Sequence, residues 1–331
     1  MIDLEKLKDV KHLVTHANCP DGVAAALIVK DALPDVRVSF VQYNTKEHLA
    51  LRPEPGTLFV DFTPHIPRFS DGLIDGHELM SWVGTGAMVL DHHDKQRAIT
   101  ENFAVNGLGV FGENDRLECG AWLAYEHVWR PIKLGHGPFN PHDDGESVRQ
   151  FAELAAVRDT WKRSHPLFER ARAQGEVLLF WGEEALEVGL SEMIEKSVSA
   201  EAEAFASLLL KKAVKTAGKA VEESYRFQTR RGTRVLMFQN TKPTTEAAEL
   251  LDKEPPDIVA GFHYRIEEGK LRLTYSMRSH AGYDVGDFAK SHPGGGGHAQ
   301  AAGFSVDQSA EIGANPYAVF RLLLGEWESG Q

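Results

Sequence analysis

Short apolar runs alternate with helical stretches through the first half of the chain, as is typical of a parallel sheet flanked by helices. Runs at 10–15, 36–42, 57–60 and 87–90 predict strands, and stretches at 22–31, 118–129 and 146–161 predict helices. The runs at 57–60 and 87–90 are apolar throughout, like strands buried on both faces. Helical patterning then continues to about residue 212, where an Ala-rich and Glu-rich stretch indicates a connector.

After residue 221 apolar and polar residues alternate, which predicts strands with one exposed face at 225–229, 235–239, 258–265 and 271–278. We predict helices at 244–251 and 316–327, and a helix beginning in the small-residue segment 299–304. The fold class is therefore α/β: a parallel-sheet domain at 1–195, a helical connector at 196–218 and a smaller α/β domain at 219–331.

Length and composition agree with two domains, since 331 residues with 42% hydrophobic content can bury two cores. The sequence has no run of about 18 apolar residues and no signal-like start, so we expect a cytoplasmic protein with no membrane partner. Its two cysteines, Cys19 and Cys119, lie too far apart in sequence for a CxxC motif. The net charge of -12 would repel a long polyphosphate backbone, so any phosphate-bearing substrate should be small.

Polar clusters follow three predicted strands of the first domain. His16 and Asp21 follow the first strand, Asp61 ends the third, and Asp91-His92-His93 follows the fourth. Ligands gather at the carboxyl ends of strands in α/β sheets, so we expect these clusters to converge on one site. Imidazoles and carboxylates suit Mn, Zn or Fe, and a carboxylate such as Asp61 can bridge two cations about 3.5 to 4 Å apart.

Each of these residues also has a purely structural interpretation. Histidine pairs are common on surfaces, Asp61 could cap a turn, and the segment around Asp21 fits a capped turn before a helix. Asp159 lies near the end of a predicted helix. On the residues alone, a surface pairing with Arg158 is favoured over metal ligation.

The second domain offers candidate anion-binding groups. The backbone amides of Gly295, Gly296 and Gly297 are unobstructed, which suits a phosphate, although a flexible linker is the competing interpretation. Arg278 could clamp a terminal phosphate or be a solvated surface residue. The aromatic run 262–264 would suit a nucleobase or belong to the core.

Five motifs follow one another along the chain: His16…Asp21-Gly22, Val60-Asp61, Asp91-His92-His93, Asp159-Thr160 and the segment from Gly294 to Gly303. Together they resemble the DHH phosphoesterases that carry a C-terminal DHH-associated (DHHA1) domain. The resemblance spans nearly the whole chain and implies two α/β domains facing each other across an active-site cleft. It further implies that Asp61 bridges the metals. Asp21, His92 and Asp159 would complete one cation site, and His16 would serve the other.

The resemblance also assigns catalytic and substrate-binding residues. His93 would contact the scissile phosphate or its water, within the catalytic set His93, Asp61 and Asp91. The terminal nucleotide or phosphate would be held by Arg278, Gly295, Gly296, Gly297 and His298. This chain departs from the family at its first motif, where Cys19 stands two residues before Asp21 in place of an acid. Either Cys19 or Asn18 replaces this acid as a metal ligand, or one of the two sites binds its metal weakly.

We therefore predict a metal-dependent phosphodiesterase or 3′-5′ exonuclease that converts short RNA or DNA oligonucleotides or dinucleotides to mononucleotides by a metal-activated water. Two Mn²⁺ ions are expected, with Mg²⁺ and Co²⁺ as alternatives. A phosphoanhydride hydrolase and a nucleotide-binding sensor with weakened catalysis are the competing hypotheses, and a homodimer is one of the assemblies left open.

Overall fold

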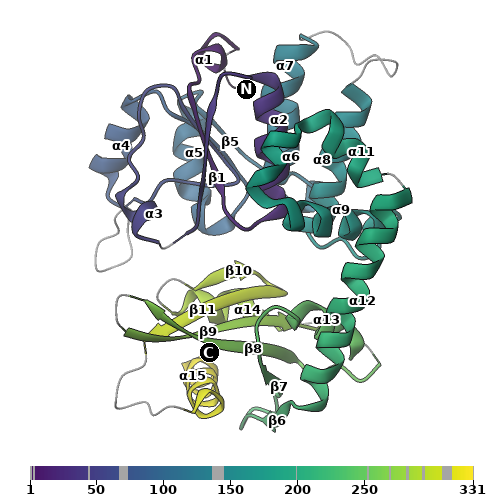
Figure 1. Ribbon diagram of the computed structural model, residues 1–331. Coiled ribbons are helices and arrows are strands. Elements are labelled where there is room, and N and C mark those ends of the chain that lie inside the picture. The colour runs from purple at the N-terminus through teal and green to yellow at the C-terminus, as the bar shows by residue number, and fades with distance from the viewer. Residues whose placement is uncertain are drawn as a thin grey trace. The chain divides into compact units, whose positions relative to one another are not determined.

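The computed structural model describes residues 2, 4–43, 45–66, 74–135, 145–198, 200–251, 253–267, 270–280, 283–292, 295–307 and 315–330. Within these residues no helix has the length and apolar character needed to cross a membrane. The chain divides into two compact units, Met1–Leu208 and Leu209–Gln331 (Figure 1). The division falls inside helix α12 (Ala200–Glu222), within the range predicted as a connector.

Unit 1 contains a five-stranded parallel sheet with the strand order β2-β1-β3-β4-β5. Its strands are β1 (His12–His16), β2 (Arg37–Val41), β3 (Thr57–Val60), β4 (Met88–Asp91) and β5 (Gly109–Phe111). Every residue of β3 and β4 is buried, as the apolar character of most of their residues predicted. The three-residue strand β5 is too short to give a periodic signal and was not predicted.

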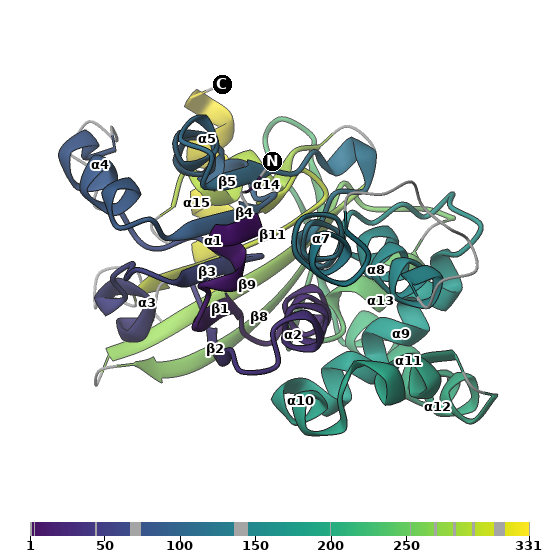
Figure 2. The same ribbon diagram turned by 90° about the horizontal axis from the view of Figure 1, so that it is seen from above.

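Helices cover both faces of this sheet, with α2, α7 and α8 on one side and α3, α4 and α5 on the other (Figure 2). The helices of unit 1 are α1 (Leu4–Lys8), α2 (Pro20–Ala32), α3 (Lys46–Ala50), α4 (Gly76–Gly84), α5 (Arg97–Val105), α6 (Gly120–Ala124), α7 (Arg130–Lys133), α8 (Gly145–Asp159), α9 (Phe168–Trp181), α10 (Ala185–Val188) and α11 (Leu190–Val198). Helix α2 is buried along most of its length because small and apolar residues occupy nearly every position, and it packs against the sheet, α6, α8 and α9. Its N-terminus lies directly after β1.

Unit 2 contains a six-stranded mixed sheet with the order β10-β11-β9-β8-β7-β6, in which only the β7–β8 pair is parallel. The strands are β6 (Tyr225–Gln228), β7 (Arg234–Gln239), β8 (Ile258–Glu267), β9 (Lys270–Ser279), β10 (Gly296–His298) and β11 (Ala301–Asp307), and the helices after α12 are α13 (Thr244–Leu250), α14 (Val285–Lys290) and α15 (Pro316–Gly330). The predicted α/β class, with a parallel sheet followed by a smaller α/β unit, is confirmed.

The prediction of one exposed face is wrong for β7, because both faces of this strand are covered. Val235 and Met237 join the core formed with α14 and α15, whereas Leu236 and Phe238 join a second core formed with α12 and α13. Alternation in β7 therefore distributes side chains between two apolar cores.

The helix predicted to begin within 299–304 is also absent from this described segment, which instead forms β11 after a tight turn from β10. Gly297 has a φ of +132°, and a Cβ added there would come within 2.3 Å of the Ala301 carbonyl oxygen. A Cβ on Gly295 would come within 2.0 Å of the Ala289 carbonyl oxygen. At these two positions the glycines permit close packing of β10, and no helix N-terminus follows them.

Candidate metal centre

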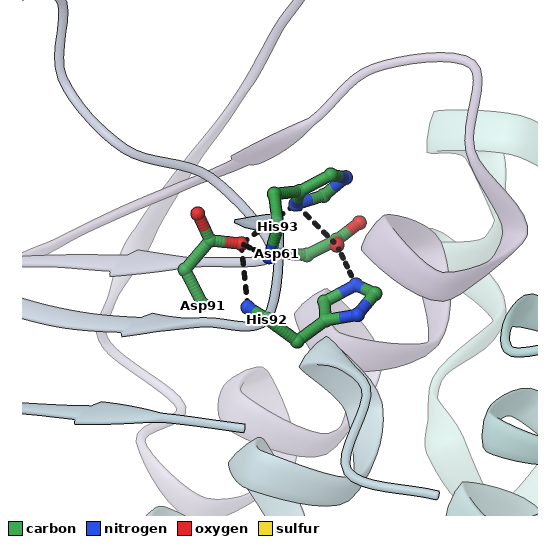
Figure 3. A group of neighbouring side chains, drawn as sticks. All are labelled: Asp61, Asp91, His92 and His93. Carbon is green, nitrogen blue, oxygen red and sulfur yellow. Dashed lines mark hydrogen bonds and ion pairs between the residues drawn. The ribbon is translucent and has the colours of Figure 1, made fainter. Parts of the chain in front are cut away.

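The polar clusters predicted after separate strands meet at the carboxyl edge of the unit 1 sheet. His16 is the last residue of β1, Asp61 follows β3, and Asp91 is the last residue of β4. These strands are neighbours in the order β1-β3-β4, and all run in the same direction. Figure 3 shows Asp61, Asp91, His92 and His93 directed toward one another. The sequence-based expectation that these side chains converge is therefore met for the described residues.

One group of potential metal ligands consists of Asp21, His92 and Asp159, whose donor atoms lie within 4.8 Å of one another. His92 Nε2 lies 3.7 Å from Asp21 Oδ2 and 3.4 Å from Asp159 Oδ2. Asp159 ends α8, and this contact contradicts the surface pairing with Arg158 that the residues alone favoured. The Arg158 guanidinium instead lies 4.0 Å from Glu176.

A second group consists of His16, Cys19 and Asp61, again with all donor atoms within 4.8 Å of one another. His16 Nδ1 and Asp61 Oδ2 are 3.7 Å apart. Two ligands at about 2.1 Å from a shared cation would have this separation at a ligand–metal–ligand angle of roughly 120°. The geometry of this pair therefore fits a common ion.

Asp61 belongs to both neighbourhoods because its two carboxylate oxygens face different partners. Oδ1 lies 3.1 Å from His92 Nε2, while Oδ2 faces His16. Among the described residues, Oδ2 and His16 Nδ1 have no hydrogen-bond partner, although both atoms are buried. Burial, followed by the charges of Asp21 and Cys19, raises the pKa of Asp61 well above its usual range. Such an acid is costly to ionise without a cation, so the donor set fits divalent metal ions.

Neighbouring side chains fix which nitrogen of each imidazole is left to bind a cation. His92 Nδ1 lies 2.7 Å from Asn114 Oδ1, and His16 Nε2 lies 2.7 Å from Gln42 Oε1. An amide oxygen only accepts, so the contacted nitrogens carry protons, and the opposite nitrogens are the ones that can bind a cation when they are deprotonated. The Asn114 amide also donates to the His92 carbonyl oxygen at 3.3 Å.

Sequence analysis missed Asn114 and Gln42. Gln42 had a usable signal, since it ends the strand predicted at 36–42 beside the first strand. Asn114 lies in a short 3₁₀ turn, Asn114–Arg116, with no pattern that indicates its role.

Asp91 contacts His93. Its Oδ1 lies 2.7 Å from His93 Nδ1 and also accepts from the His92 backbone N–H at 2.9 Å. Burial alone would raise the pKa of Asp91, but the charge of His93 and its hydrogen bond hold it below the usual value. Asp91 is therefore suited to orienting His93, whose side chain is 24% exposed.

The N-terminus of α6 holds the Asp21 carboxylate. Oδ2 accepts from the Gly120 N–H at 2.7 Å, and Oδ1 accepts from the Ala121 N–H at 2.9 Å and from Cys119 Sγ at 2.8 Å. A Cβ on Gly120 would come within 2.4 Å of Asp61 Cβ, so only glycine allows this approach. Burial and the charge of Asp159 nevertheless raise the pKa of Asp21.

The predicted substrate-binding residues lie in unit 2. The Arg278 guanidinium donates to Thr245 Oγ1 at 3.0 Å and to the Met277 carbonyl oxygen at 2.8 Å. In the sheet register Arg278 lies opposite Ala301 of β11, which pairs in turn with His298 of β10. Gly295, Gly296 and Gly297 lead into or form β10, while Gly294 and the His298 side chain lie outside the described residues. Substrate binding by these residues stays a prediction.

The aromatic run 262–264 is divided between core and surface. Phe262 is buried in the core with Tyr275 and packs on Tyr317 at a ring-centroid distance of 5.2 Å. Tyr264 is 37% exposed. Phe262 therefore belongs to the core, which was one of the two interpretations of this run.

Comparison with known proteins identifies one domain and a shared fold. The DHHA1 domain model matches residues 235–315. No curated protein matches the chain. Among solved structures, a DHH domain described as a member of the s1p family of ribosomal proteins has a TM-score of 0.57 at 12% identity, with 97% of this chain and 87% of that chain covered.

Two other solved structures align over nearly all of this chain with lower TM-scores. RecJ from Thermus thermophilus, in complex with Mn²⁺, has a TM-score of 0.49 at 17% identity, and the alignment covers 99% of this chain and 53% of RecJ. The pGpG-specific phosphodiesterase PggH from Vibrio cholerae has a TM-score of 0.38 at 12% identity, covering 97% of this chain and all of PggH.

The DHHA1 match contains most of unit 2, and the α/β architecture agrees with that of the DHH domain in the structural comparison. These findings show a DHHA1 domain and a fold shared with a DHH domain, in a chain whose potential metal ligands gather at the carboxyl edge of the unit 1 sheet. The resemblance predicted from the sequence is confirmed: residues 235–315 match the DHHA1 domain model, and the fold of the chain is similar to that of a solved DHH domain.

Proposed function

We propose that this chain is a metal-dependent phosphodiesterase or 3′-5′ exonuclease that hydrolyses short oligonucleotides or dinucleotides to mononucleotides. The observation that carries the proposal is the division of the Asp61 carboxylate between two donor groups, with Oδ1 toward His92 and Oδ2 toward His16. A carboxylate shared in this way is the central part of a two-metal phosphoryl-transfer site.

In this proposal Asp21, His92 and Asp159 hold one divalent cation, His16 contributes to the other, and Asp61 bridges them. Manganese suits the mixture of imidazole and carboxylate ligands, and Mg²⁺ and Co²⁺ are the alternatives. When bound, such cations supply a nucleophilic water at neutral pH and offset negative charge on the phosphate.

His93 is the proposed contact to the scissile phosphate. Its Nδ1 is engaged by Asp91 at 2.7 Å, which fixes the orientation of the ring. Burial alone would lower the pKa of His93, but Asp91 and Asp61 together raise it, which favours the positively charged form beside a phosphate. Asp91 acts in this proposal by orienting His93.

Arg278 and the β10 backbone are the proposed grip for the terminal nucleotide or phosphate. Ser276 lies two residues from Arg278 on the same face of the sheet, paired in register with Gly261 of β8 and Gly303 of β11. The net charge of -12 favours a substrate with few phosphates.

The test is a Mn²⁺-supplemented digestion panel of the full chain with pApA, pGpG, longer RNA, single-stranded DNA, cyclic dinucleotides and pyrophosphate, followed by product identification. The Asp61→Ala variant, purified in parallel, controls for contaminating nucleases. We expect mononucleotides from the dinucleotides and at least about a 10²-fold loss in the variant, since it lacks the shared ligand.

Two outcomes would contradict the proposal. Orthophosphate from pyrophosphate with intact dinucleotides would identify a phosphoanhydride hydrolase. Saturable dinucleotide binding without mononucleotide release, at full metal content, would identify a sensor.

A further inference from the structure

The two halves of the candidate metal centre differ in chemical character. The group around His92 offers two carboxylates and an imidazole, whereas the group around His16 contains the thiol of Cys19. Carboxylates favour hard cations such as Mg²⁺ and Mn²⁺, while a thiolate favours softer ones. The difference originates at Cys19, which supplies the sulfur donor of the second group.

Local backbone structure places Cys19 against the other donors. Asn18, immediately before it, has a φ of +55°, which turns the chain between β1 and α2. Cys19 is the N-cap residue of α2, but its side chain makes no capping hydrogen bond. Its sulfur is instead within 4.8 Å of the donor atoms of both His16 and Asp61.

An independent observation points to a ligand at this position. Asp61, 1% exposed, directs Oδ2 toward the group, and this oxygen has no hydrogen-bond partner among the described residues. His16 Nδ1 is likewise without a hydrogen bond there, and the contact of Nε2 with Gln42 leaves Nδ1 as the nitrogen with a lone pair. An imidazole nitrogen and a carboxylate oxygen are thus left for a third component.

We propose that Cys19 binds the second cation as a thiolate together with His16 and Asp61, so that the centre has one oxygen- and nitrogen-ligated position and one sulfur-containing position. This inference rests on the proposed two-metal site and adds the identity of a ligand to it. A bond from sulfur to the cation forms, the S–H bond breaks, and the proton leaves to solvent.

The softness of the cation should decide how strongly its binding depends on Cys19. A thiolate binds soft cations such as Cd²⁺ more strongly than hard cations such as Mg²⁺, and Co²⁺ lies between them. Binding of Cd²⁺, and to a smaller extent of Co²⁺, should therefore depend on Cys19 far more than binding of Mg²⁺ does.

The test is a Co²⁺ titration of the metal-free full chain, followed by near-ultraviolet absorption, where a thiolate-to-cobalt charge-transfer band reports sulfur ligation. The chain has only two cysteines, so two single variants assign the band. We expect it in the wild type and in Cys119→Ser, and its absence in Cys19→Ser. Cys19→Asp should bind Co²⁺ without the band, which separates lost sulfur ligation from misfolding.

The same proteins are titrated calorimetrically with Cd²⁺ and Mg²⁺. Cys19→Ser should lower Cd²⁺ affinity by about 10- to 100-fold and change Mg²⁺ affinity far less. A band that persists in Cys19→Ser, or cobalt bound to the wild type without a band, overturns the thiolate assignment while leaving the phosphodiesterase proposal standing. Absence of both cobalt binding and hydrolysis overturns the two together.

Discussion

Replacing Asp61 with asparagine should stabilise the metal-free protein, whereas most substitutions of buried residues destabilise a protein. Without metal, Asp61 is a buried acid beside Asp21, and its Oδ2 has no hydrogen-bond partner in the described part of the chain. Asparagine keeps the shape, removes the charge and tolerates the left-handed backbone of this position, where φ is +57°. His92 would still face the carboxylates of Asp21 and Asp159, so its own charge keeps two partners.

The expected gain follows from the His16 Nδ1 lone pair, which faces this position and can accept from an asparagine N–H but not from a carboxylate oxygen. Leaving such a buried polar group unsatisfied costs about 1 to 3 kcal/mol. For a unit of this size each kcal/mol shifts Tm by about 2 to 4 °C, so metal-free Asp61→Asn should melt roughly 2 to 12 °C above the wild type. With metal at 100 times its Kd the wild type should gain about 2.7 kcal/mol, whereas the variant, lacking the shared carboxylate, should gain far less.

The assay is thermal unfolding of both proteins in chelator and in excess Mn²⁺, with Asp35→Asn, an exposed site, as the matched control. The control should follow the wild type in both conditions. A variant less stable than the wild type in chelator, or equally stabilised by Mn²⁺, would refute the reasoning that Asp61 is held at a cost for metal binding.

Four further predictions rest on the same contacts. Gly120→Ala should abolish metal-dependent stabilisation, because its Cβ would come within 2.4 Å of Asp61 Cβ, while Gly84→Ala, with no atom within 4 Å, should retain it in the same melting assay. Asn114→Ala should weaken Mn²⁺ binding about 10- to 100-fold by calorimetry, since the His92 ring loses its orienting acceptor. Mn²⁺ affinity should increase as pH rises above 6.5 and through the raised pKa of His92, because ligation requires the neutral ring, and pH-independent affinity would contradict this. The free energy of unfolding of the metal-free protein should fall over the same pH range. The raised pKa of His92 contributes stability that is lost as pH rises through that pKa.

The parts of the site that could be predicted are those that follow from strand position alone. The apolar runs of β3 and β4 end at Asp61 and Asp91, and carboxyl ends of parallel strands share one edge of a sheet. The apolar pattern therefore predicts where these acids lie, and the position of His16 at the end of β1 follows the same rule.

Residues that reach the site from helices and turns gave no comparable signal. Asp159 follows an arginine on a helix, a pattern that exposed ion pairs also produce, and only the packing of α8 against α2 and α6 brings it to His92. The glycines before β10 indicated close backbone approach but could not distinguish a helix N-terminus from a strand turn. Both structures use glycine for the same steric reason.

Two departures from ordinary backbone preferences and two from ordinary burial preferences lie at the metal centre. Asn18 and Asp61 adopt left-handed backbone at φ values of +55° and +57°, a conformation that costs about 1 to 3 kcal/mol for a residue with a side chain. Burial raises the pKa of both Asp61 and Asp21, which adds a cost to ionising either acid. A divalent cation bound to the ionised acids would offset these costs. The strain and the buried charge are thus best explained by ligand binding, because a chain adapted only for stability would have no reason to keep them.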